Sequence, residues 1–167
     1  VGDNPRMSNN EMLISMFERN VKFIKLATQG FDHAASLIQP PLGANCANWL
    51  LGHLLYYRNR LCTITGRPLA LDAAIAARYP NGSLAVTGDE PGLGKWEDML
   101  AAFEASQEPL AANLRAMTHE EADKVWTFTS AANTTSMTAL DWHVYFMRHE
   151  AYHAGQFEWM PNLLKAR

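Results

Sequence analysis

The chain has 167 residues, of which 48% are apolar and 19% are charged, and its formal net charge is −3 at pH 7. This length and balance predict one globular domain over residues 1–167, with enough apolar residues to bury a core. The charge excludes a strongly basic surface of the kind that binds nucleic acid or an anionic membrane. No apolar run reaches the ~18 residues of a membrane-spanning helix, and no signal pattern precedes the first helix, so we expect a cytoplasmic protein.

Four long helices are predicted in chain order. The first begins at a capping box formed by Ser8 and Glu11 and ends at Gly30. The second runs from about residue 45 to 65, the third from about 96 to 114 with a kink at Pro109, and the fourth begins near residue 138. These lengths and their apolar spacing predict an all-α fold, a four-helix bundle.

The connections differ in length. Residues 31–43 join the first two helices, and a long, partly irregular connection joins helices two and three. Within it, residues 69–78 predict a short helix and the Gly- and Pro-rich residues 80–94 predict a loop. Beta-branched residues gather at 126–138, a stretch that we expect to be too short for a sheet.

The string His-Glu-x-x-His at residues 149–153 indicates a metal site on the fourth helix. One turn of helix takes ~3.6 residues, so His149 and His153 lie on the same side and both imidazoles can reach one ion. In zinc proteases this motif needs a third ligand downstream. Here Gln156 and Trp159 stand where the extended motif has glycine and histidine, so a third ligand has to come from upstream.

The upstream candidate is His53, within the apolar segment 48–57. The pairing of Trp-Leu-Leu-Gly-His at 49–53 with His-Glu-Ala-Tyr-His-Ala-Gly-Gln at 149–156 resembles the DinB-like superfamily of four-helix-bundle metalloproteins. The resemblance extends over the whole chain in length and helix order. It implies a divalent metal held by His53, His149 and His153. Imidazole ligands suit zinc or nickel, with iron as a further candidate. The alternative is that each histidine satisfies only a local hydrogen bond.

Two residues beside the ligands are candidate catalytic groups. The Glu150 carboxylate can act as a base toward metal-bound water, or it can form a salt bridge on the helix flank with Arg148 or another cation. The Gln156 amide can orient a ligand imidazole or a bound water, or it can bridge two helices in the core.

On the second helix, four side chains share the side of His53: Cys46, Trp49, Tyr57 and Arg60. We expect Trp49 and Tyr57 to line the pocket, and Arg60 either to anchor an anionic substrate or to be exposed at the helix end. Cys46 lies ~10 Å from His53 along the axis, too far to bind the same ion. It lies ~24 Å from Cys62, so the two cysteines cannot form a disulfide and we expect reduced thiols.

Three imidazoles leave coordination positions open for a small-molecule substrate, which is typical of a catalytic metal site. The family resemblance implies a metal-dependent enzyme that activates a small thiol for S-transfer to an electrophile. The alternatives are a metal-dependent hydrolase that uses metal-bound water, and a non-catalytic bundle that binds a metal or ligand.

A homodimer is also expected. The fourth helix is apolar almost all round, and a helix on the outside of a monomer normally shows a charged face. The apolar residues beyond the ligand side are Val144, Phe146, Met147, Tyr152, Phe157 and Trp159.

Overall fold

The computed structural model describes residues 9–130 and 133–165 of the chain. It is mostly helical, with 65% helix and 7% strand. The long helices are α1 (Asn9–Ala27), α3 (Ala47–Ile64), α5 (Trp96–Ala105), α6 (Gln107–Ala116) and α8 (Ala139–Lys165). The shorter elements are α2 (His33–Ser36), the 3-10 turn η1 (Pro41–Gly43), α4 (Ala73–Arg78), α7 (His119–Asp123), β1 (Val125–Thr129) and β2 (Thr134–Thr138).

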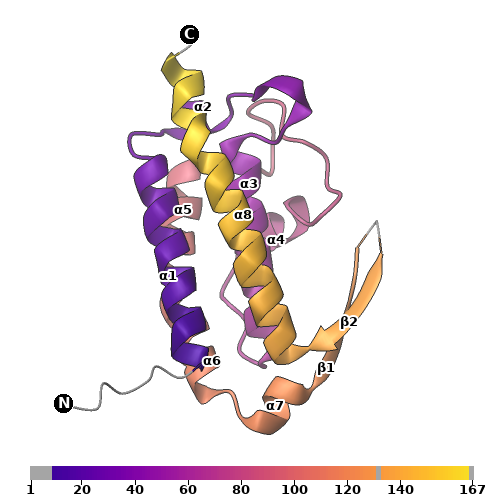
Figure 1. Cartoon of the computed structure of the whole chain (residues 1–167). Coiled ribbons are helices and arrows are strands. Elements are labelled where there is room, and N and C mark those ends of the chain that lie inside the picture. The colour runs from indigo at the N-terminus through magenta and orange to yellow at the C-terminus, as the bar shows by residue number, and fades with distance from the viewer. Residues whose placement is uncertain (1–8, 131–132, 166–167) are drawn as a thin grey trace, which may run out of the picture.

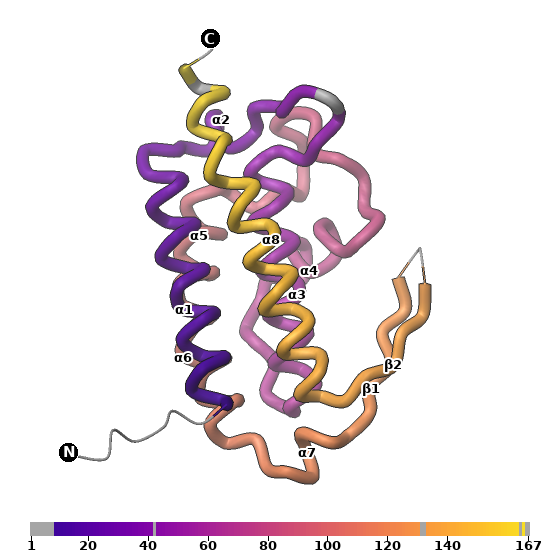
Figure 2. The backbone as a smooth tube through the Cα atoms, viewed as in Figure 1, coloured from indigo at the N-terminus to yellow at the C-terminus, as the bar shows by residue number. Residues whose placement is uncertain are grey.

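The long helices lie alongside one another, with α8 in front of α3 and beside α1 in the view of Figure 1. The chain returns after α3 to the end where α3 began, because Asn48 Nδ2 donates to the Gly94 carbonyl at 3.0 Å. Asn10 Nδ2 donates to the Leu114 carbonyl at 2.8 Å, so α1 begins where α6 ends. Thus α3 and α5–α6 run one way while α1 and α8 run the other, as the tube in Figure 2 shows.

Two apolar clusters fill the space between the helices. One cluster gathers around the start of α3 and the carboxyl half of α8, with Trp96, Phe103 and Phe157 among its buried rings. The other gathers around the end of α3 and the start of α8, with Phe17 and Phe146 among its rings. The helices therefore pack along their whole length, but through two separate sets of apolar contacts.

A buried ion pair joins Arg58 of α3 to Glu150 of α8 between the two clusters. Arg58 Nε and Nη2 donate to the two Glu150 carboxylate oxygens at 2.7 and 2.8 Å, and the side chains are 1% and 3% exposed. Arg58 Nη1 donates to Ser106 Oγ and the Phe103 carbonyl, and Nη2 to the Phe17 carbonyl. All five N–H groups of the guanidinium are thus paired, and they reach α1, α8 and the α5–α6 junction.

Residues 125–138 form a β-hairpin, so the expectation that this stretch is too short for a sheet is wrong. β1 and β2 pair antiparallel with Val125 opposite Thr138 and Thr129 opposite Thr134. The hairpin is held to α8 because Trp142 Nε1 donates to the Trp126 carbonyl at 2.9 Å. A two-stranded hairpin is marginal in water by itself, and here the packing of its inner face on α8 stabilises it.

The third long helix is divided rather than kinked: α5 ends at Ala105 and α6 begins at Gln107. Pro109, the third residue of α6, has no N–H and its ring crowds the carbonyl four residues earlier, that of Ala105. The break thus occurs where Pro109 predicts a disturbance. The short helix predicted within residues 69–78 is present as α4, over Ala73–Arg78 only. Ser8 of the predicted capping box lies outside the described residues.

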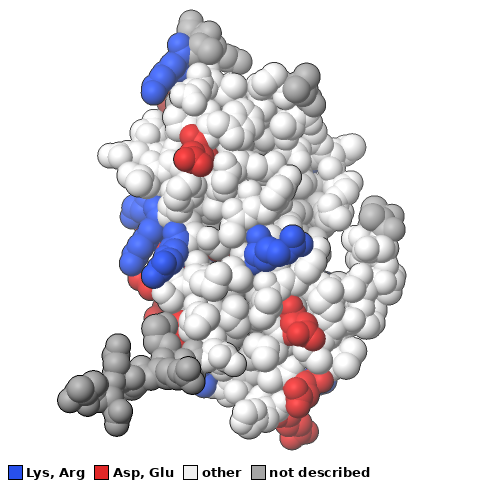
Figure 3. Space-filling model, in the orientation of Figure 1, with Lys and Arg blue, Asp and Glu red and all other residues white. Residues whose placement is uncertain are grey.

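The apolar residues of α8 do not all face outward. Phe146 and Phe157 are buried within the chain, which removes two of the six residues on which the dimer expectation was based. Val144 is 46% exposed and Tyr152 is 66% exposed, and the surface over α8 in Figure 3 carries only scattered charges. A homodimer stays a prediction.

Within the described residues, no helix has the length and apolar content to cross a membrane.

The ion pair gives a stability prediction. Glu150→Gln keeps the side-chain size but leaves the Arg58 guanidinium buried without its counter-charge, and such a change typically costs ~3–5 kcal/mol. We expect urea unfolding to show that loss in the free energy of unfolding. The matched control is Glu18→Gln, because Glu18 pairs with Lys22 on the exposed surface of α1, where a change should be small. Equal unfolding midpoints for the two variants would contradict the prediction.

Candidate metal centre

Three histidines from two helices converge at one point. His53 lies in α3, and His149 and His153 lie one turn apart in α8. Each offers one ring nitrogen, and these three atoms lie within 4.8 Å of one another. His53 is buried and the other two are partly buried. The structure thus brings together the three residues that the sequence predicts as ligands, in a group that could hold a metal ion.

The outer hydrogen bonds of two histidines place the lone pair of each ring on Nε2, the nitrogen that can bind an ion. His53 Nδ1 lies 2.9 Å from the Tyr79 carbonyl oxygen, which can only accept, so the proton is on Nδ1 and Nε2 keeps its lone pair. His153 Nδ1 lies 2.6 Å from Gln156 Oε1, which likewise accepts, so the lone pair of this ring is on Nε2, the atom that faces His149. Metal-binding histidines commonly make such outer hydrogen bonds, because these fix the tautomer and the ring orientation.

The two histidines of α8 also have a spacing that fits a shared ion. His149 Nε2 lies 3.0 Å from His153 Nε2. Two nitrogens bound to one ion at ~2.1 Å lie roughly 3.0 Å apart at right angles and roughly 3.4 Å apart at a tetrahedral angle. His149 Nδ1 is buried without a partner among the described residues, so its ring is held by packing against Tyr57 and Phe146.

The three imidazoles are neutral at physiological pH. Burial lowers the pKa of His53 to about 4. Burial, together with the neighbouring His153 and His53, lowers the pKa of His149 to about 3. Burial also lowers the pKa of His153. Since a neutral imidazole has the lone pair that a metal needs, the site is ready to bind a cation without first losing a proton near pH 7.

Tyr79 determines the position of His53, and Gly52 makes room for it. A Cβ at Gly52 would lie 2.5 Å from the Tyr79 ring, so only glycine lets this ring rest on α3. The Tyr79 hydroxyl donates to Asn48 Oδ1 at 2.8 Å and accepts from the Gly94 N–H. The hydroxyl end of the ring is thereby fixed by two hydrogen bonds, and the Tyr79 carbonyl lies 2.9 Å from His53 Nδ1. This explains physically why glycine precedes the histidine in α3.

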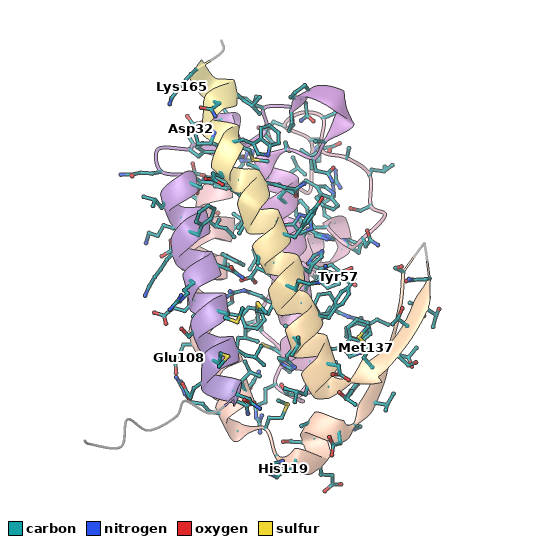
Figure 4. The ribbon with its side chains drawn as sticks, viewed as in Figure 1. Asp32, Tyr57, Glu108, His119, Met137 and Lys165 are labelled. Atoms are coloured by element: carbon teal, nitrogen blue, oxygen red, sulfur yellow. The ribbon has the colours of Figure 1, made fainter. Side chains whose placement is uncertain are left out.

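A pocket of about 660 Å³ opens beside the histidines. α3, α8 and the hairpin form its walls, and Trp49 and Tyr57 line it as predicted. Trp49 stacks on the His53 ring with centroids 4.4 Å apart. Figure 4 shows Tyr57 and Met137 on the same side of α8, between that helix and the hairpin. Among the described residues that line the pocket, Arg60 is the one permanent cation and there is no carboxylate.

The two predicted catalytic residues have different positions. Gln156 bonds to His153, as in the first of its two predicted roles. Glu150 points into the core, where both carboxylate oxygens are bound by Arg58, and it does not line the pocket. The salt bridge foreseen for Glu150 therefore exists, but it is buried and its partner is Arg58 rather than Arg148. A carboxylate held in this way is poorly placed to take a proton from a ligand in the pocket.

The pocket is also lined by residues that the sequence did not place there. Phe128 and Thr135 lie opposite each other in the hairpin, and Tyr145 and Tyr152 come from α8. The alternation of Trp126 and Phe128 with threonines is typical of a strand with one buried face, and this signal could have revealed the hairpin wall. The carbonyl of Tyr79 had no such signal, because any residue has one.

The remaining histidines lie apart from this group. His143 is buried and its Nδ1 bonds to the Ala139 carbonyl within α8. His33 bonds to Asp89 and accepts from the Trp96 N–H at the start of α5. His119 is exposed at the start of α7.

The fold and the site together define a class of protein. It is mostly helical and has three histidines in a group that could hold a metal ion. Comparison with family models matches residues 23–157 to the DinB superfamily. Because the match covers well over half of the chain, the protein belongs to this superfamily, and the resemblance stated from sequence is confirmed.

Comparison of structures gives the same fold at low sequence identity. A conserved protein from Enterococcus faecalis is 13% identical, with a TM-score of 0.71 over 96% of this chain and 99% of that one. At this identity the likeness shows the fold alone. No curated protein matches the sequence.

Gly52→Ala tests the support of His53. Alanine is favoured over glycine within a helix by ~1 kcal/mol, yet here its Cβ would displace the Tyr79 ring. We expect a lower melting temperature and weaker zinc binding, measured by calorimetry. The matched control is Gly155→Ala in α8, where a Cβ meets nothing within 4 Å, so this variant should be slightly more stable and keep its zinc affinity. A Gly52→Ala protein with unchanged zinc affinity would contradict the role of Tyr79.

Replacing each histidine tests the ligand set. His53→Ala, His149→Ala and His153→Ala should each lose most of the bound metal, because two imidazoles hold a divalent ion much less tightly than three. Far-UV circular dichroism should stay largely unchanged, since the two apolar clusters carry the fold. His143→Ala is a control that removes a buried histidine outside the group. Metal analysis that finds full occupancy in His53→Ala would exclude the three-histidine set.

Proposed function

We propose that the protein is a metal-dependent enzyme that activates a small thiol and transfers it to an electrophile. The observation that carries the proposal is the convergence of three neutral imidazoles beside a pocket large enough for a small molecule. Three protein ligands leave coordination positions open, which is typical of catalytic rather than structural metal sites. Zinc or nickel suits this donor set, and iron is a further candidate.

His53, His149 and His153 would hold a divalent ion, which would supply the Lewis-acid chemistry that lowers the pKa of a small thiol in the pocket. In such a transfer a bond from the thiol sulfur to the electrophilic carbon would replace the bond to the leaving group, which would depart with its bonding electrons, and the thiol proton would pass to water. No carboxylate lines the described part of the pocket, which is consistent with a reaction that needs no strong protein base.

The aromatic wall has a role in this proposal. Burial raises the pKa of Tyr57 to about 12, so its phenol stays protonated and can donate a hydrogen bond to a bound substrate. The rings of Trp49 and Tyr57 contact His53 and exclude water from one side of it. Water exclusion strengthens each polar contact in the pocket.

The thiol has to come from outside the chain. Cys46 is fully buried at the start of α3 and its Sγ lies 3.9 Å from the Val86 carbonyl. Burial raises the pKa of Cys46, and it raises the pKa of Cys62 to about 11. Both are inert thiols. Free buried cysteines also support the proposed cytoplasmic location, since a reducing compartment keeps thiols unpaired.

A hydrolase is the weaker alternative on this geometry. A hydrolytic mechanism with Glu150 as base requires its carboxylate to reach the pocket, whereas Arg58 holds it in the core. A non-catalytic metal-binding bundle would need no pocket beside the metal. We also propose that α1, α3, α5–α6 and α8 form a four-helix bundle, which the contacts between these helices support. We further propose a homodimer through the exposed face of α8, which the exposed Val144 and Tyr152 support.

Thiol dependence tests the proposed function. With the zinc-loaded or nickel-loaded protein and a chromogenic aryl halide, we expect turnover that saturates with added small thiol and stops when the metal is chelated. Cys46→Ala and Cys62→Ala should leave the rate nearly unchanged, because neither thiol lines the pocket. Hydrolysis of ester or amide substrates at full rate without thiol would instead favour the hydrolase.

A further inference from the structure

Arg60 lies at the far end of the pocket from the histidines. It follows His53 by seven residues in α3, so it is on the same face of the helix, ~10 Å further along the axis. Its guanidinium lies over the Phe128 ring of the hairpin, 4.2 Å from the ring centre. Arg60 is half-buried and lines the pocket. It makes no hydrogen bond or ion pair with a residue that the structure describes.

Arg58, two residues earlier in the same helix, shows which partners a guanidinium of this kind has when it is fully paired. Arg58 also lies over a phenylalanine, 4.2 Å from the Phe103 ring centre, and Glu150 binds it with both oxygens. Arg60 has the same aromatic support but has no carboxylate opposite it. A half-buried guanidinium with a planar fork of donors is well suited to a carboxylate or phosphate.

The rest of the pocket favours an anion there. No Asp or Glu lines the described part of the pocket, so no negative protein charge there opposes an anionic ligand. Thr135 lies directly opposite Phe128 in the hairpin and also lines the pocket, which gives a hydroxyl near the guanidinium. Arg148 carries the next charge on the α8 side, 5.6 Å from the Tyr145 ring, and does not line the pocket.

We propose that Arg60 binds the carboxylate, or an equivalent oxyanion, of a small organic acid whose reacting end lies at the three histidines. This inference rests on the proposed function and names its substrate class: a molecule whose anionic group is separated from its reacting end by about the spacing of His53 and Arg60, two turns of α3. The neutral middle of the molecule lies along the aromatic wall formed by Tyr56, Tyr57 and Trp142. Arg60 is therefore a specificity residue for the ligand and does not hold the metal.

A length series of thiols tests the proposal on the zinc-loaded protein. The probes are ω-mercaptoalkanoic acids of four to ten carbons, the neutral ω-mercaptoalcohols of the same lengths and the matching phosphonates, with binding measured by calorimetry. We expect the best acid to bind about tenfold or more tightly than its alcohol, since a hydrogen-bonded charge contributes that much. The preference should peak where the chain spans the distance between sulfur and guanidinium. A stronger preference for phosphonates that also depends on Arg60 supports the same subsite with phosphate as the natural group.

Two variants give the control. Arg60→Met keeps an apolar stem on Phe128, so it should lose the preference for acids while its zinc content and its affinity for the alcohols stay the same. Arg19→Gln removes one exposed cation from α1, away from the pocket, and should keep the preference. Equal affinity for acids and alcohols in the unchanged protein, or a preference that survives Arg60→Met, would overturn the proposal.

A further binding measurement distinguishes failure of the metal-dependent function from failure of the anion subsite at Arg60. Alkanoic acids without a thiol should still bind the metal-free protein, weakly and only with Arg60 present. If these acids bind in this way while zinc is not retained or the thiol adds no affinity, the anion subsite stands and the metal-thiol function is excluded. If zinc and thiols bind but Arg60→Met changes nothing, the function stands and the subsite is excluded.

Discussion

The contact between Arg58 and Glu150 determines how α8 faces the rest of the protein. Glu150 occupies the middle of the buried side of α8, and its carboxylate is bound within the core by a guanidinium from α3. At 100° per residue, His149 and His153 then lie 100° and 60° from Glu150 on the same flank, at the boundary between core and pocket. A buried ion pair is weak evidence for stability because of its desolvation cost, but it can select one arrangement of helices. Here the ion pair occurs together with the rotation of α8 that directs both imidazoles toward His53.

The same contact explains why the glutamate of His-Glu-x-x-His has a different role here from its role in zinc proteases. The motif requires only that two histidines share a helical side, and the glutamate between them can point elsewhere. In this chain the glutamate faces the interior, where an arginine neutralises it. The spacing of the histidines thus predicts a metal site, whereas the position of the glutamate depends on what the neighbouring helices offer to it.

Sequence reasoning was most successful where the information is local. The shared side of His149 and His153, and the placement of Trp49, His53 and Tyr57 on one side of a helix, follow from periodicity alone, and the structure has these arrangements. The hairpin was missed because each of its strands has only five residues, and its stability comes from contacts with Trp142 and Phe146 that local sequence does not reveal. The role of Tyr79 was missed because a backbone carbonyl acts there, and its position depends on Gly52 and Gly94, far apart in the chain.

The long helices and the segments between them contribute different parts of the site. α3 and α8 bring all three histidines, so the potential metal centre depends on the packing of two helices. The connection after α3 supplies the Tyr79 carbonyl that orients His53, and the hairpin before α8 supplies the wall of the pocket. Since a hairpin tolerates change better than a packed core, the hairpin can vary the shape of the pocket without moving the two helices that carry the histidines. α3 presents Arg58 to the core and Arg60 to the pocket, roughly 200° apart around the helix axis. One helix thereby separates a guanidinium that is paired within the core from a guanidinium that lines the pocket.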